Sequence, residues 1–161
     1  MGGAAVELYT LGAYTTGDFD FVGDVPESVA KALDDAGFER KGRHWIRAQG
    51  EIFVEFPGSS LQEHERPAML DVDGTRVLTL SAEDMIVDRL AAWQFWRSTT
   101  DGASAYLIWK AQEDRLDRRR LSSLADRRKV GRALSRLERF VEESSSEADA
   151  EQVERWAREV P

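Results

Sequence analysis

Two aspartates, Asp18 and Asp20, stand two positions apart in the segment Asp-Phe-Asp-Phe-Val-Gly and are the strongest candidates for chemistry in this sequence. Because side chains alternate between the two faces of a strand, a strand over 18–23 would place both carboxylates on one face, their backbones roughly 7 Å apart. Hard divalent cations such as Mg²⁺ prefer oxygen ligands and keep positions open for substrate phosphates. The pair therefore predicts a metal site of the kind that a nucleotide–metal complex uses.

Two further features are candidates for the same site. Gly2 and Gly3 stand at the start of a predicted short helix, because the composition of residues 3–10 favours a helix. Backbone N–H groups without side-chain cover, together with the helix dipole, can hold a triphosphate at such a start. Glu55 lies in a later strand-like run, 52–56, where it either supplies a third carboxylate or faces solvent.

The order of these features resembles the signature of the nucleotidyltransferase (polymerase-beta-like) superfamily. In that signature a Gly-Gly or Gly-Ser helix is followed by two acidic residues on one strand and a third on a later strand. The segment 80–92, with Arg89 where relatives carry a lysine, resembles the branch of abortive-infection type toxin nucleotidyltransferases. The resemblance covers about residues 2–110. The motifs that carry it are Gly2-Gly3-x-Ala, Thr16-x-Asp18-Phe-Asp20-Phe and Val54-Glu55-Phe56.

The resemblance implies a magnesium-dependent enzyme that transfers NMP from an NTP to a hydroxyl and releases pyrophosphate. Its toxin branch implies RNA, tRNA above all, as the acceptor and an antitoxin protein as a partner. Glu55 would complete a two-metal site or take the proton from the attacking hydroxyl, and Asp101 is a weaker candidate for orienting Arg89 or the base. The implied catalytic and metal-binding residues are Asp18, Asp20 and Glu55; the implied nucleotide-binding residues are Gly2, Gly3, Thr16 and Arg89.

Two other functions stay open on the same residues. A catalytically inactive domain of this type would act as a binding or antitoxin partner, and other relatives transfer a nucleotide to small molecules of the antibiotic type. Relatives usually carry a helix and a strand before the glycine pair, which predicts either an N-terminus upstream of Met1 or a sheet without that edge element. Gly17 stands where relatives often show a basic or bulky residue, and the missing basic group would weaken nucleotide binding.

The composition predicts a globular protein, and the predicted elements together with the resemblance imply an α/β (α+β) fold. The chain has 161 residues, of which 42% are hydrophobic, and none of its apolar runs approaches the roughly 20 residues of a membrane span. The absence of cysteine and of a secretory pattern predicts a cytoplasmic protein without a membrane partner. We expect a mixed sheet flanked by helices over 1–100 and a helical region over 101–161 packed on this core.

Hydrophobic periodicity and capping signals predict the individual elements. Residues 81–84 form a capping signature for the helix that follows, and the segment between 58 and 76 is predicted as a polar loop. The predicted helices are about 3–10, 26–36, 82–96, 102–113, 117–141 with breaks, and 147–159, with a joint at 144–146; the predicted strands are 18–23, 44–46, 52–56 and 76–80.

A basic segment stands out in an acidic chain. Residues 110–140 hold eleven Lys or Arg against five Asp or Glu, whereas the whole chain has a net charge of −8. Such a strip can bind RNA phosphates, but a solvated helical face with acidic partners is the favoured interpretation. The aromatic side chains between 93 and 109 are predicted to lie in the core rather than to stack on bases. His44 and His64 lack the spacing of zinc ligands and are assigned no role.

Overall fold

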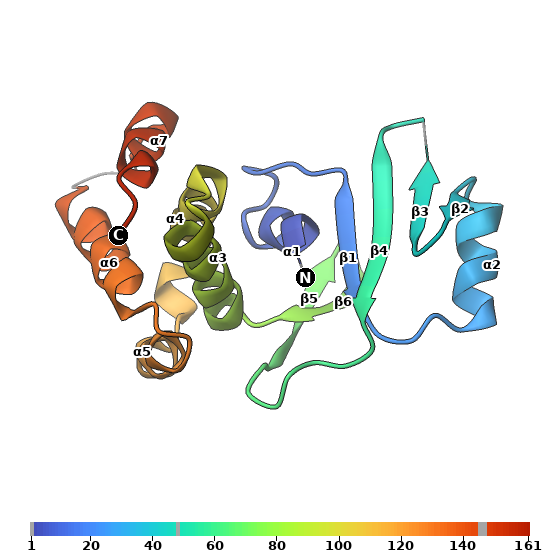
Figure 1. The fold of residues 1–161 in the computed structure, drawn as a ribbon, viewed down its shortest axis with the longest axis horizontal. Helices are drawn as coiled ribbons and strands as arrows, with labels where there is room; N and C mark the ends of the chain where they lie inside the picture. Colours follow the sequence, from blue (N-terminus) through green and yellow to red (C-terminus); the bar gives the residue numbers. More distant parts are fainter. Residues whose placement is uncertain (1, 48, 145–147) are drawn as a thin grey trace. The chain divides into compact units, whose positions relative to one another are not determined.

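The computed structural model describes residues 2–47, 49–144 and 148–161, and the chain forms two compact units, 1–79 and 80–161 (Figure 1). The first unit contains the sheets and the second is helical, so the predicted α+β class is confirmed. In this division helix α3 (Ala82–Trp96) belongs with helix α4 (Thr99–Gln112), on which it packs most extensively.

The first unit is built on a four-stranded mixed sheet in the order β1-β4-β3-β2. Strand β4 lies parallel to β1 and antiparallel to β3, and β3 lies antiparallel to β2. Helix α1 packs on β1 at one end of this sheet, and α2 contacts β2 at the other (Figure 1). The bounds are α1 Gly2–Tyr9, β1 Asp18–Val22, α2 Glu27–Asp35, β2 Glu39–Lys41, β3 His44–Arg47 and β4 Ile52–Gly58.

The strand register sorts the side chains of this sheet by face. Asp20 of β1 lies beside Glu55 of β4, and Glu55 lies beside His44 of β3. Because paired residues project to the same side of a sheet, these three form one row across three strands. Trp45 and Val54, which are also paired, are 2% and 5% exposed on the opposite face. The sheet therefore has one face with a polar row and one with a buried apolar row.

Two strands depart from the predictions. β2 (Glu39–Lys41) has no apolar residue, and β5 (Pro67–Val72) lies in the segment predicted as a loop. The first is an edge strand whose exposed side chains give no periodic signal. The second pairs with β6 (Thr75–Leu80) in a separate two-stranded sheet, and it begins with Pro67, a residue that argues against an interior strand. The prediction of a loop was wrong for β5 and β2 was not predicted, because pairing with a neighbouring strand decides the outcome at such short segments.

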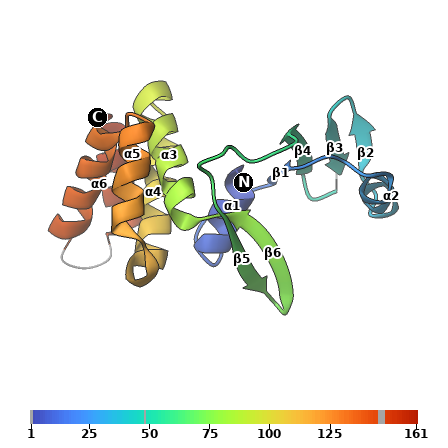
Figure 2. The ribbon, with the colours of Figure 1, turned by 90° about the horizontal axis from the view of Figure 1, so that it is seen from below.

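The second unit packs its helices around α3 and α4. Figure 2 shows α5 and α6 alongside this pair, and both contact α3. The predicted helix 117–141 is broken between α5 and α6, where Lys129 has a φ of 59°. The predicted start at 147 and most of the joint at 144–146 lie outside the described residues. The remaining bounds are η1 Glu113–Arg115, α5 Arg118–Arg127, α6 Gly131–Glu143 and α7 Ala150–Arg158.

The aromatic prediction for this unit is only partly confirmed. Trp93, Tyr106 and Trp109 are at most 2% exposed and form the core. Phe95 and Trp96, in the last turn of α3, are 56% and 82% exposed. No helix within the described residues combines the length and the apolar character that a membrane crossing needs.

Candidate nucleotide site

The start of α1 lies against the carboxylate of Asp20. An ideal Cβ atom on Gly2 would be 1.8 Å from Oδ2 of Asp20, and one on Gly3 would be 2.6 Å from Oγ1 of Thr16. Real Cβ atoms essentially never approach a heavy atom within 3.0 Å, so neither position accepts a side chain without a shift. Gly2 also has a φ of 68°, in the left-handed region. The two glycines thus bring the backbone at the start of the helix against Asp20 and Thr16, two of the residues predicted for the site.

Thr16 links this helix to the strand that carries the aspartates. Its N–H donates to Oε2 of Glu7 in α1 at 3.0 Å, and its Oγ1 accepts from the N–H of Asp18 at 3.1 Å. The hydroxyl therefore fixes the beginning of β1 relative to the helix start. The contact of Thr16 with a nucleotide stays a prediction.

The structure explains why position 17 is a glycine. A Cβ atom there would lie 2.3 Å from the backbone O of Glu51, and the carbonyl of Gly17 accepts from the N–H of Phe53 at 2.7 Å. The backbone just before β4 passes too close for any side chain. The basic or bulky residue that the resemblance leads us to expect does not fit at this position.

Glu55 is held by two residues that the sequence did not connect with it. Its Oε1 lies 2.9 Å from Nε of Arg43, and its Oε2 lies 3.4 Å from Nδ1 of His44. The Glu55 side chain is 22% exposed, whereas that of Arg43 is 72% exposed. No sequence signal could have shown this contact, because His44 meets Glu55 only through the register of β3 and β4.

Asp18 and Asp20 suit a hard cation by the chemistry of their donors, since Mg²⁺ is commonly bound through one or two carboxylates and substrate phosphates. Among the described residues, no three acidic, histidine or cysteine side chains are grouped closely enough to hold a metal ion. Glu55 would have to leave Arg43 to join the aspartates. An ion pair with one exposed side chain contributes about 0–1 kcal/mol to stability, so breaking the pair between Glu55 and Arg43 would cost little. The fit to magnesium therefore rests on the two aspartates.

Arg89 belongs to the second unit, on α3. Its Nη1 lies 2.6 Å from Oδ1 of Asp101 and its Nη2 lies 2.6 Å from Oδ2 of Asp88. The predicted contact between Asp101 and Arg89 is thus present. The side chain of Arg89 is 20% exposed, and its contact with a nucleotide stays a prediction.

No family model, curated protein or solved structure matches this chain. Folds of this general kind host many unrelated activities, so function has to be argued from the site. The residues around Asp20 carry that argument.

Proposed function

We propose that this protein is a magnesium-dependent nucleotidyltransferase that moves NMP from an NTP to a hydroxyl of RNA, tRNA in particular, in a toxin-like setting. The observation that supports this most is the packing of the Gly2-Gly3 start of α1 against Asp20 and Thr16. It places the start of a helix, whose first N–H groups lack partners within the helix and favour phosphate, beside a carboxylate that favours a cation. A nucleotide–metal complex presents both partners together.

The residues divide the work by their chemistry. Bound Mg²⁺ would neutralise charge on the transferring and leaving phosphate oxygens, and Asp18 and Asp20 would hold it. The first N–H groups of α1 would bind phosphate oxygens. Glu55, once released from Arg43, would accept the proton of the attacking hydroxyl or join the aspartates.

One observation favours a second candidate, the catalytically inactive binding or antitoxin partner. Glu55 is already engaged by Arg43 and His44, an arrangement that withholds its carboxylate from both of its proposed roles. In an inactive domain the Gly2-Gly3 start and Asp20 would still bind a nucleotide. Binding and transfer therefore have to be measured separately.

Transfer is tested by incubating the protein with Mg²⁺, each labelled NTP and either total tRNA or an aminoglycoside. We expect labelled tRNA, and at least about a 100-fold slower reaction in Asp18→Asn or Asp20→Asn, equivalent to about 2.7 kcal/mol of lost transition-state stabilisation. Asp34→Asn, an equal charge change at an exposed position on α2, is the matched control.

Each result separates the candidates. Labelling that persists in both Asp18→Asn and Asp20→Asn would show that the site is elsewhere. Mg²⁺-dependent NTP binding without transfer to either acceptor would identify the inactive partner, and label on the aminoglycoside alone would identify a small-molecule enzyme. Absence of Mg²⁺-dependent NTP binding would remove the proposal altogether.

A further inference from the structure

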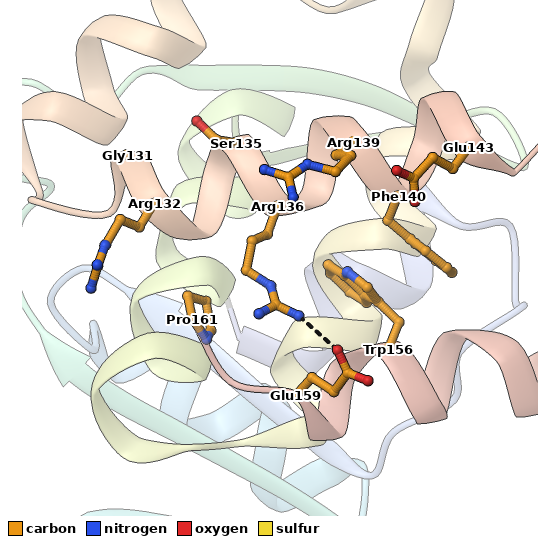
Figure 3. Close-up of a pocket in the computed structure, with 10 residues that line it drawn as sticks. All are labelled: Gly131, Arg132, Ser135, Arg136, Arg139, Phe140, Glu143, Trp156, Glu159 and Pro161. Carbon is orange, nitrogen blue, oxygen red and sulfur yellow. Dashed lines mark hydrogen bonds and ion pairs between the residues drawn. The ribbon is translucent and has the colours of Figure 1, made fainter.

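A groove of about 790 Å³ lies between α6 and α7 in the second unit (Figure 3). Its α6 side carries three arginines, and we call this cavity the arginine groove. The groove is lined among others by Arg132, Arg136, Arg139, Phe140, Trp156 and Glu159. All of these residues lie within one unit, so the cavity is complete without the first unit.

The spacing of the arginines aligns them along the helix. Arg132, Arg136 and Arg139 stand four and three positions apart. At 3.6 residues per turn, they fall within an arc of about 60° and span about 10 Å along the helix axis. The three guanidinium groups therefore follow one another along the groove instead of surrounding a single point.

Two carboxylates, Glu143 and Glu159, also line the groove, and among the described residues only Glu159 forms an ion pair with one of the three arginines. Nη2 of Arg136 lies 3.2 Å from Oε2 of Glu159, an ion pair drawn in Figure 3. Arg132 and Arg139 are exposed, and neither side chain has an ion-pair or hydrogen-bond partner in the described part of the chain. Just before α6, the side chains of Arg127 and Lys129 are also exposed and without such a partner among those residues. Cationic side chains without an ion-pair partner thus stand just before α6 and along its groove side.

Two aromatic side chains that line the groove indicate the kind of anion that it binds. The rings of Phe140 and Trp156 are stacked, with centroids 4.8 Å apart and planes inclined by 9°. Phe140 stays partly exposed, whereas Trp156 is 9% exposed. Proteins that bind single-stranded nucleic acid combine a cationic groove along the backbone with aromatic surface for the bases. Guanidinium groups also match phosphate through two parallel hydrogen bonds.

We propose that the arginine groove binds the phosphate backbone of single-stranded RNA. A line of separate cations suits a polymer with a charge on every unit better than one compact anion, and the partly exposed Phe140 offers a ring edge to a base. This inference rests on the proposed function for the role of RNA as acceptor, but binding can be measured without transfer. The groove would then bind a part of the RNA other than the hydroxyl that reacts.

Binding is tested by fluorescence anisotropy with a labelled oligouridylate at several salt concentrations. Each phosphate contact on a single strand contributes about 0.7 to the slope of log K against log salt, so R132Q/R139Q should lower the slope by about 1.4. The control R76Q/K31Q removes the same charge from exposed positions in the first unit and should leave the slope unchanged. Circular dichroism checks that both proteins are folded.

A third variant tests the opposite direction. Glu159 is 71% exposed and is the ion-pair partner of Arg136. E159Q removes this competing carboxylate, so we expect the oligouridylate to bind several-fold more tightly. Weaker binding by E159Q would contradict a role of Arg136 in holding phosphate.

Other results would overturn the proposal. These are an equal loss of affinity in R76Q/K31Q, an undiminished affinity in R132Q/R139Q, or equally tight binding of an oligoglutamate peptide, which would indicate an acidic protein partner instead. The D18N/D20N protein should bind the oligouridylate as the wild type does. Arginine-dependent RNA binding without nucleotide transfer would therefore preserve this inference while the proposed function fails.

Discussion

Gly2 lies so close to Asp20 that a Cβ atom on the glycine would stand 1.8 Å from Oδ2 of the aspartate. The contact joins the first residue of α1 to the middle of β1. It places the start of the helix beside the carboxylate, which is why both are assigned to one site. The same closeness makes the site sensitive to a single methyl group.

Gly2→Ala should therefore disrupt the site more than the fold. The methyl group must displace the carboxylate of Asp20, and the φ of 68° adds about 1–2 kcal/mol of backbone strain unless the helix start shifts. We expect Mg²⁺-dependent ATP binding to fall at least about tenfold by calorimetry, equivalent to about 1.4 kcal/mol. Gly12→Ala is the control, because Gly12 has a φ of 86° but a methyl group there would meet no atom within 4 Å. Equal losses in both variants would attribute the effect to backbone strain alone.

Glu138 on α6 should make stability depend on pH. Burial raises the pKa of this carboxyl above its ordinary value of 4.5 and Glu142 adds to the rise, while Arg118 opposes it. A raised pKa means that the folded state binds the proton more tightly, so the stability present below pH 4.5 is lost as pH rises through the folded pKa. Glu138→Gln should thus raise the melting temperature relative to wild type at pH 7 and not at pH 4. The exposed Glu63→Gln is the control, and a lowered melting temperature at pH 7 would contradict the expectation.

Asp84 and Arg120 form the most buried ion pair described in the helical unit. Their side chains are 4% and 14% exposed, with Oδ2 of Asp84 2.5 Å from Nη2 of Arg120. Asp84→Ala leaves the arginine charge buried and should lower the free energy of unfolding by about 3–5 kcal/mol. Asp84→Leu/Arg120→Met removes both charges and should recover most of that loss in urea denaturation. A double variant as unstable as Asp84→Ala would show that the loss of stability comes from altered packing and not from the buried arginine charge.

Gly102 on α4 lies against the ring of Trp93 on α3. A Cβ atom there would be 2.9 Å from Cγ and Cδ1 of the indole, which is 0% exposed and held by a 2.6 Å hydrogen bond from Nε1 to the carbonyl of Ala157. Gly102→Ala gains about 1 kcal/mol of helix propensity but overpacks the core by about 1–3 kcal/mol, so we expect net destabilisation in thermal denaturation. Gly131→Ala meets only Oδ1 of Asp126 at 3.6 Å and should be neutral or stabilising. A stabilised Gly102→Ala protein would show that the ring can move aside.

Sequence reasoning succeeded where local chemistry is strong. The alternation around Asp18 and Asp20 predicted β1, and the cap was confirmed at Ser81, whose Oγ accepts from the N–H of Asp84 at 3.2 Å. The predictions failed where the structure of a segment depends on its contacts with another segment. Strand β2 exists because β3 pairs with it, and Trp96 is exposed although its apolar character suggested the core.

The sequence by itself determined which side chains share a strand face and which residues can begin a helix, because both follow from the geometry of a few consecutive residues. Only the tertiary structure decided that Gly2 meets Asp20, that Glu55 stands beside Asp20 and takes Arg43 as its partner, and that three arginines border one groove. Strand register and helix packing are set by contacts between distant segments, and the spacing within either segment does not encode them. The arrangement of the paired aspartates could therefore be predicted from the sequence, whereas the residues around them could not.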